Sequence, residues 1–249
     1  MHAHFKSNKF SHHGREVKDH VWTYSFVSST ELLKDTFDLQ HMELFQNHRY
    51  NIAPGQFIMA IIQSDDHRTL TFWKWGLIPF WAKENHASYS SFNAKSETVF
   101  DKPMFRVPVR KQRCLIPADG FYEWKRTGKT KQPMRIVVTD RPVFAFAGIY
   151  DVWRDKEGNT LHTVSILTTS PNALMQDIHD RMPVILPPES EATWLNPTIQ
   201  DRAVLEPLLI PYPADQMRAF PVASMVNNAK NDVLACVEPS SIEQPSFFD

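Results

Sequence analysis

The chain has 249 residues, of which 42% are hydrophobic and 12% aromatic, so it can bury a sizeable core without disulfide bonds or a structural metal. Its net charge is −1, and its two cysteines, Cys114 and Cys236, have neither disulfide-framework nor metal-ligand spacing, which fits a reducing, cytoplasmic location. No apolar run is long enough for a membrane span, and the N-terminus lacks the layout of a signal peptide, so we expect neither a membrane protein nor a secreted one.

In chain order, the first predicted element is a short helix over residues 28–37, where Ser28 and Glu31 have capping-box spacing. Strands are predicted over residues 56–63 and 69–78, joined by the polar turn SDDHR. The stretch 105–112 is ambiguous because Pro108 interrupts it.

The second half of the chain is richer in strands. Residues 113–125 have the pattern of a strand, a turn and a strand, and further strands are predicted over residues 133–139, 143–153 and 161–170. The strand at 143–153 is apolar on both faces, which predicts burial on both. Short helices are predicted over residues 170–178, where Ser170 would be the N-cap, and over residues 188–195 and 201–209. The pattern predicts an α+β fold, with a single domain built on a mostly antiparallel, barrel-like sheet and short flanking helices.

Charge is unevenly distributed along the chain. Residues 102–135 contain ten basic and two acidic residues, whereas residues 186–249 contain three basic and nine acidic ones. Such a basic stretch is typical of a surface that binds an anion such as a nucleic-acid backbone, but a solvated basic hairpin explains the same composition equally well.

Three stretches place polar side chains among apolar ones. The first, SFNAKSET, contains Asn93, although it also fits a helix entry. The second, ADGFYEWK, sets Glu123 between aromatic residues, which predicts a raised pKa suited to proton transfer; the alternative is a solvent-facing glutamate paired with a lysine. The third, DIHDRMPVIL, contains His179, which would also suit the C-terminus of a helix. Together the three residues form a possible acid–base set without a nucleophile.

The sequence contains no recognisable motif for a conventional nucleophile or for a metal site. The serines lack the G-x-S-x-G elbow, and Cys114 lies within an apolar strand, where a thiol is usually inert packing. The N-terminal histidines could bind a metal adventitiously, but no metal site is predicted.

The chain resembles the SRAP family, the SOS-response-associated peptidases or abasic-site processing proteins. The resemblance rests on an ordered series of motifs from about Phe26 to Val233, namely RYNIAPGQ, WGLIPFWAK, NAKSETVFDKPMFR, RCLIPADGFYEWK, KQPMRI, FAFAGIYD, TTSPN, IHDRMPVIL and VNNAKND. The unusual IHDRMP and the order of the motifs make the match specific.

The resemblance implies binding of single-stranded DNA that carries an abasic site. In the family, the residue left after removal of the initiator methionine is a cysteine. Its α-amine condenses with the ring-opened sugar, and its thiol closes a thiazolidine. An α-amine has a pKa of about 7.7–8.0 against about 10.4 for lysine, so far more of it is free to attack at neutral pH. The peptidase name refers to the proposed removal of residues ahead of that cysteine, which makes the expected enzyme a hydrolase of the peptidase type.

The resemblance also assigns roles to residues. Asn93 would orient the amine and the sugar, Glu123 would shuttle protons, and His179 would hold the sugar and help to open it. Phosphate contacts are expected from Arg49, Lys95, Arg106, Arg110 and Arg181, and stacking beside the lesion from Trp81. The family usually has arginine where this chain has Lys95, and lysine lacks the bidentate fork of arginine.

The family start, Met-Cys-Gly-Arg, is missing where His20-Val21-Trp22-Thr23 stands. If these residues are encoded as CAT GTG TGG ACG, reading one base later gives ATG TGT GGA CG, which encodes Met-Cys-Gly and begins an arginine codon. Our hypothesis is that residues 1–23 are an out-of-frame, disordered extension, followed by an SRAP-like domain over residues 24–238 and a loose tail over residues 239–249.

The expected protein is therefore a cytoplasmic monomer without a cofactor, whose partner is single-stranded DNA with abasic sites. The alternatives are a non-covalent DNA binder or inactive family member, and a conventional hydrolase that uses Cys114 or a serine.

Overall fold

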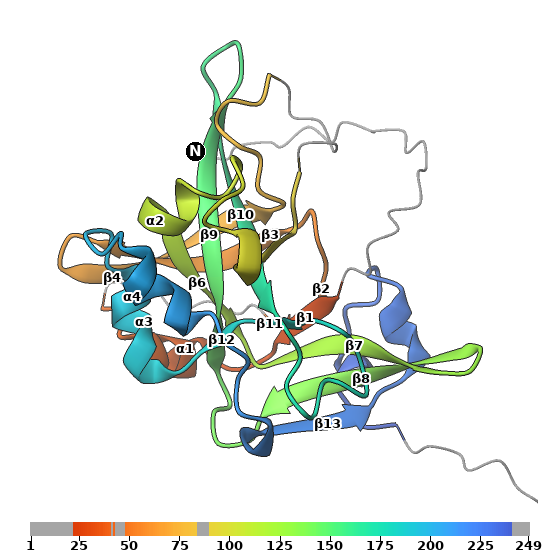
Figure 1. Cartoon of the computed structure of the whole chain (residues 1–249). Helices are drawn as coiled ribbons and strands as arrows, with labels where there is room; N and C mark the ends of the chain where they lie inside the picture. The colour runs from red at the N-terminus through yellow and green to blue at the C-terminus, as the bar shows by residue number, and fades with distance from the viewer. Residues whose placement is uncertain (1–21, 41, 43–47, 84–89, 241–249) are drawn as a thin grey trace, which may run out of the picture.

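A computed structural model of the chain describes residues 22–40, 42, 48–83 and 90–240 (Figure 1). The strands are β1 (Thr23–Phe26), β2 (Arg49–Ile52), β3 (Phe57–Ser64), β4 (His67–Trp75), β5 (Asn93–Lys95), β6 (Arg113–Ala118), β7 (Gly120–Thr127), β8 (Thr130–Val138), β9 (Phe144–Arg154), β10 (Thr160–Thr169), β11 (Met182–Pro183), β12 (Ile185–Leu186) and β13 (Met217–Pro221). The α-helices are α1 (Thr30–Phe37), α2 (Pro108–Lys111), α3 (Pro188–Leu195) and α4 (Arg202–Leu205). The 3-10 helices are η2 (Ser96–Thr98), η3 (Glu206–Leu208), η4 (Ala214–Gln216), η5 (Ser224–Asn227) and η6 (Leu234–Cys236).

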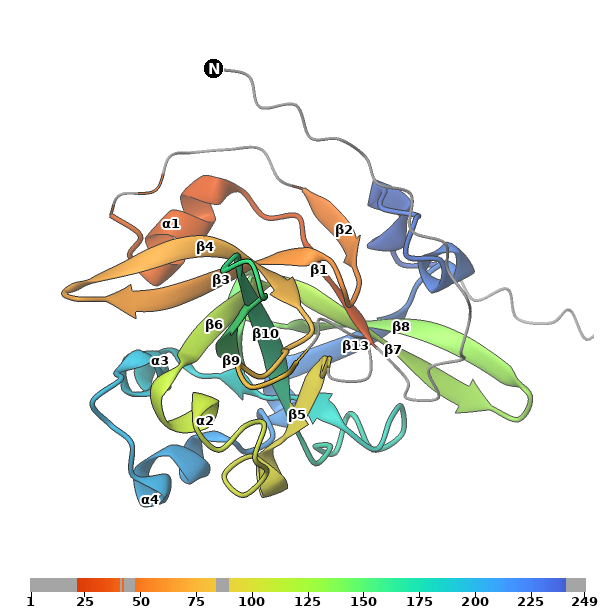
Figure 2. The same ribbon diagram turned by 90° about the horizontal axis from the view of Figure 1, so that it is seen from above.

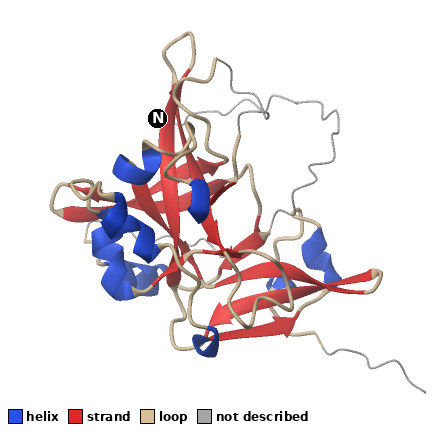
Figure 3. Ribbon diagram, viewed as in Figure 1, coloured by secondary structure: helices blue, strands red, loops and turns tan. Residues whose placement is uncertain are grey.

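Five strands close into a barrel in the order β10-β4-β3-β6-β9, and the pairing of β9 with β10 completes the ring. Only the pairing of β10 with β4 is parallel within this ring. Strand β9 is buried without interruption over residues 144–149, as expected for a strand that is apolar on both faces. Short helices lie outside the strands (Figure 3). The predicted α+β fold with a mostly antiparallel, barrel-like sheet is thus confirmed.

A second, antiparallel sheet has the order β13-β8-β7-β1-β2 and leads away from the barrel. Strands β7 and β8 form a hairpin whose turn contains Gly128 with a φ of +61°, a conformation that favours glycine. Strand β1 pairs with the first residues of β7 only, and the rest of the hairpin projects from the body of the molecule (Figures 1 and 2). The hairpin therefore carries one end of β7 away from the core.

Two local predictions were wrong in detail. The N-cap of α1 is Ser29, whose hydroxyl accepts a hydrogen bond from the main chain of Leu32, whereas Ser28 contacts Asp119 instead. Residues 170–178 form successive turns rather than a helix, because the Asn172 side chain accepts from the main chain of Met175 and donates to the carbonyl of Tyr212. The loop that carries His179 is consequently shaped by side-chain contacts.

The C-terminal limit of the domain also lies later than expected. The main-chain N–H of Ser240 donates to the carbonyl of Pro221 at 2.9 Å, and Pro239 bridges Val222, so these two residues belong to the fold. The rest of the expected tail, residues 241–249, lies outside the described residues. Within the described ranges, no helix has the length and apolar character needed to cross a membrane.

Candidate functional site

Glu123 lies midway along β7 and is only 1% exposed. Burial raises the pKa of its carboxyl group to about 8; the Trp124 N–H acts in the opposite direction, and the charge of Asp180 adds to the rise. The raised pKa predicted from the aromatic neighbours is confirmed. Near neutral pH this carboxyl group is mostly protonated. Its pKa is also close enough to neutral pH for the group both to donate and to accept a proton, as a proton-transfer group requires.

His179 comes to Glu123 from a different part of the chain. Its Nδ1 is 3.8 Å from Oε1 of Glu123, and it accepts a hydrogen bond from the main-chain N–H of Arg181 at 3.1 Å. The carbonyl of Arg181 lies 3.3 Å from the same nitrogen, and a carboxylate oxygen of Asp180 lies 3.1 Å from it.

Arg181 anchors this loop to η2 and to β10. Its guanidinium donates to both carboxylate oxygens of Glu97, at 2.6 and 2.9 Å, and to the carbonyl of Thr168 on β10 at 2.6 Å. The bidentate pair lowers the pKa of Glu97. The Arg181 guanidinium, which is expected to contact a phosphate, is therefore already hydrogen-bonded to other residues of the protein. Its phosphate contact stays a prediction.

Asn93 begins β5, which pairs in parallel with β10. Its side-chain oxygen is buried and has no hydrogen-bond partner among the described residues. Leaving such an acceptor unpaired costs about 1–3 kcal/mol, so a ligand that donates to it would be favoured here. The contacts described for this region do not join Asn93 directly to Glu123 or His179; they connect through β10, which Arg181 contacts.

The first described residues lie between these two parts of the site. Thr23 pairs with the residue before Glu123. The Trp22 ring packs on that of Trp75, with centroids 5.3 Å apart, and the Trp75 indole donates at 2.8 Å to the carbonyl of the residue before Asn93. The start of β1 thus pairs directly with the strand of Glu123 and is linked through Trp75 to the residue before Asn93.

The described fold begins two residues before Tyr24, where the domain boundary is expected. Trp22 is 3% exposed and Thr23 belongs to β1, because the indole fills an aromatic part of the core that the sequence pattern could not reveal. However, the Trp22 indole nitrogen and the Thr23 hydroxyl are buried without a partner in the described part of the chain. These side chains fill the space, but their own polar atoms are left without hydrogen bonds there. Residues 1–21, on which the rest of the extension hypothesis depends, lie outside the described residues.

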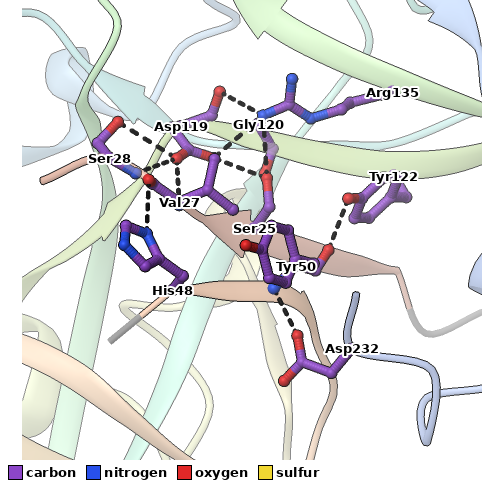
Figure 4. Close-up of polar contacts among 10 residues, drawn as sticks. All are labelled: Ser25, Val27, Ser28, His48, Tyr50, Asp119, Gly120, Tyr122, Arg135 and Asp232. Atoms are coloured by element: carbon purple, nitrogen blue, oxygen red, sulfur yellow. Dashed lines mark hydrogen bonds and ion pairs between the residues drawn. The ribbon is translucent and has the colours of Figure 1, made fainter. Parts of the chain in front are cut away.

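A buried carboxylate fixes the course of the chain after β1. Asp119 accepts hydrogen bonds from the Ser25 hydroxyl at 2.7 Å, from the main-chain N–H groups of Val27 and Ser28, and from the guanidinium of Arg135 at 3.1 Å (Figure 4). The sequence predicted only a turn at ADG, and nothing in the pattern shows that its aspartate organises a distant strand.

A second aspartate does the same for β2. Asp232 accepts from the main-chain N–H of Tyr50 (Figure 4). It also accepts from the main-chain N–H of Asn51 and from the guanidinium of Arg49 at 2.5 Å. The Tyr122 hydroxyl donates to the carbonyl of Tyr50 at 2.6 Å and links β2 to β7. These contacts engage Arg49, so its expected phosphate contact also stays a prediction.

A pocket of about 450 Å³ opens beside Glu123 and His179. The hairpin side of the pocket is formed by Glu123, Trp124, Arg126 and Lys131, and the other side by residues 176–180. Its volume lies in the range of small-molecule sites and can accommodate a sugar with a flanking phosphate. The two acid–base candidates therefore line a pocket that is open to ligand.

The basic stretch seen in the sequence is not one surface. Arg113 is buried and donates to main-chain carbonyls that include those of Val109 and Trp194, and burial lowers its pKa to about 10. Arg135 pairs with Asp119. The composition over residues 102–135 thus overstates the charge available to DNA, because part of it is used inside the fold.

The remaining DNA-binding candidates are dispersed. Lys95 is exposed at the end of β5, and Trp81 is 48% exposed. Arg106 is exposed just before α2, and Arg110 on α2 donates to the carbonyl of Gln200. Helix α2 lies apart from the β7–β8 hairpin in both views (Figures 1 and 2). Lys95, by contrast, pairs with Thr168 on β10, to whose carbonyl Arg181 donates. The DNA contacts of all these candidates stay predictions.

Cys114 is buried in β6, and burial raises the pKa of its thiol. A thiol that is kept protonated and out of solvent is a poor nucleophile. The structure therefore gives no support to a hydrolase that uses Cys114.

Glu123 predicts a specific dependence of stability on pH. Its pKa is raised to about 8 in the folded state, whereas an unfolded glutamate titrates near pH 4.3. Between these values the folded state binds the extra proton, so the contribution of Glu123 to stability is greatest at low pH and is lost as pH rises toward 8, by up to about 1.4 kcal/mol per pH unit. Glu123→Gln should remove this slope in urea unfolding measured at intervals from pH 5 to 8. An equal slope in both proteins would contradict the assignment.

Comparisons with known proteins agree with the motifs in the sequence. The family model for SOS response associated peptidase (SRAP) matches residues 23–229. Abasic site processing protein YoqW of Bacillus subtilis (strain 168) is 52% identical over 190 residues, which cover 76% of this chain and 85% of that protein. Abasic site processing protein HMCES of Mus musculus is 32% identical over 200 residues, which cover 68% of this chain and 56% of that protein. A crystal structure from Bacteroides thetaiotaomicron has a TM-score of 0.78 and 31% identity over 88% of this chain and 99% of that one.

Proposed function

Because the chain belongs to the SOS response associated peptidase (SRAP) family, we propose that it is an abasic site processing protein that binds single-stranded DNA. The names of its relatives support the abasic-site role. The observation that carries the proposal is the meeting of Glu123 and His179, with Nδ1 3.8 Å from Oε1, at a pocket beside the start of β1.

We assign the steps as follows. His179 holds the abasic sugar and helps its ring to open to the aldehyde. Glu123 gives and takes the protons that ring opening and the loss of water require, and its pKa of about 8 suits both directions near neutral pH. The amide of Asn93 orients the attacking amine and the sugar, using a side-chain oxygen that is otherwise unpaired in the described structure.

In the family, the attacking amine belongs to an N-terminal cysteine, and we propose that the native start of this chain supplies one. Residues 1–23 would then be an out-of-frame reading, with glycine at position 22 and arginine at position 23. The unpartnered polar atoms of Trp22 and Thr23 support the view that these side chains are foreign to the site. The chain as written would bind DNA without forming the covalent link. The linked removal of residues ahead of the cysteine belongs to the same proposal.

A binding measurement tests the proposal on the chain as it stands. We expect fluorescence anisotropy to show tighter binding to a single-stranded oligonucleotide with an abasic site than to the matched duplex, and denaturation should leave no adduct. Failure to bind single strands at low salt would overturn the proposed function. Hydrolysis of a peptide or ester that disappears in Cys114→Ala would favour the conventional hydrolase instead.

A further inference from the structure

The wall that the β7–β8 hairpin gives to the pocket is basic. Arg126 on β7 and Lys131 on β8 both line the pocket. They are direct cross-strand partners and form the second pair from the turn. Two basic side chains therefore stand next to each other on this wall, and an anion in the pocket is attracted by both.

The facing wall of the pocket has the opposite sign. Asp177 and Asp180 come from the loop over residues 176–180, and the Asp180 side chain is largely exposed. Glu123 adds little negative charge between the two walls near neutral pH, because its carboxyl group mostly keeps its proton. The field across the pocket therefore draws an anion toward the hairpin and away from the loop.

We propose that Arg126 and Lys131 hold one phosphodiester group of the DNA next to the abasic sugar. This inference rests on the proposed function and deepens it, because it names the side of the pocket along which the DNA backbone runs. The sugar lies at Glu123 and His179, the phosphate lies against the hairpin, and the two aspartates repel the strand from the loop. The direction in which the lesion enters the pocket is then fixed by charge as well as by shape.

The chain offers matched controls on the same hairpin. Lys125 is next to Arg126, and Lys129 lies at the turn between β7 and β8, but neither lines the pocket. Substitution to glutamine at any of these four positions removes the same charge. A difference between the two pairs of variants therefore reports the position of the charge rather than the net charge.

The experiment measures binding of the full chain to a single-stranded oligonucleotide with a non-reactive tetrahydrofuran abasic analogue, as a function of salt. R126Q and K131Q should each reduce the slope of log affinity against log salt by ~0.7, the value for one phosphate contact on a single strand. K125Q and K129Q should reduce it markedly less. Thermal unfolding checks that the four variants remain equally folded.

A second arm identifies the phosphate. Replacing the phosphodiesters that flank the abasic analogue, one at a time, by neutral methylphosphonates should weaken wild-type binding at one position and have no further effect in the R126Q/K131Q double variant. If the wild type binds but the pocket variants behave like K125Q, or the methylphosphonate effects persist in the double variant, this inference is overturned and the proposed function stands. If the wild type binds no single-stranded DNA, both fail.

Discussion

A chain in which Met-Cys-Gly-Arg replaces residues 1–23 is expected to form a link with abasic single-stranded DNA that survives denaturation, whereas the chain as written forms none. Hydrolysis of the bond between the initiator methionine and the cysteine first frees the cysteine α-amine. This amine adds to the sugar aldehyde, and loss of water gives an imine. The thiol then adds to the imine carbon, the proton moves to nitrogen, and a thiazolidine ring closes. The reaction needs the first residues beside Glu123, which is where the pairing of β1 with β7 holds them.

Denaturing electrophoresis of the mixture is the measurement, and two variants control it. Cysteine replaced by alanine in the new start should give no stable adduct, because an imine alone is reversible. Glu123→Gln in the same chain should slow the link by roughly 10²–10⁴-fold, the usual range for a lost acid–base group. If the chain with the new start folds but forms no adduct, the proposed covalent link through an N-terminal cysteine is wrong. Sequencing the genomic DNA across the codons for Lys18 to Phe26 tests separately whether one base is missing.

Asp119→Ala is expected to lower the free energy of unfolding by about 3–5 kcal/mol, the range for removing one partner of a buried ion pair. The Asp119 and Arg135 side chains are 5% and 12% exposed, so the substitution leaves a guanidinium largely out of solvent without its carboxylate. It also removes the acceptor for the main-chain N–H groups of Val27 and Ser28. Urea unfolding at pH 7 measures the loss.

Asp155→Ala is the matched control for this prediction. Asp155 also accepts main-chain hydrogen bonds, from Glu157 and Asn159, but it does so in an exposed turn. We expect its replacement to change the free energy of unfolding far less than the loss of Asp119. Equal losses in the two variants would show that Asp119 is merely another turn residue. In the chain with the Met-Cys-Gly-Arg start, Asp119→Ala should also slow the covalent link, because β1 would no longer be fixed beside the site.

The sheet could be predicted from the sequence because its strands carry their own signal. The strand at residues 143–153 is apolar on both faces, and the barrel strand β9 that it becomes is buried on both. The helix predicted at residues 170–178 failed for a different reason. Asn172 makes hydrogen bonds with Met175 and with the distant Tyr212, and a local pattern contains no information about the second partner.

Residues of the candidate site could be predicted where their sequence neighbours identify them, and not where their environment depends on residues far away in the sequence. Glu123 was singled out by its aromatic neighbours, and burial raises its pKa as predicted. Tyr122 and Trp124 themselves lie in a cluster with Val222 and Cys236, because adjacent residues of a strand point to opposite faces. The count of basic residues could not reveal that Arg113 is buried and donates to main-chain carbonyls, because a sequence does not show where in the fold each charge lies. For the same reason Trp22 was placed outside the domain, although it packs against Trp75 in the core.

The pairing of β1 with β7 has a consequence for synthesis of the chain. The Ser25 hydroxyl donates to the carbonyl of Gly120, a residue 95 positions later. At about 5–20 residues per second, a ribosome makes this partner roughly 5–20 s after β1. During that time β1, which carries the buried side chains Tyr24 and Phe26, has no β7 to join. The strand made first therefore docks only after the middle of the chain has emerged, and the part of the sheet that contains β1 is completed late although β1 is translated early.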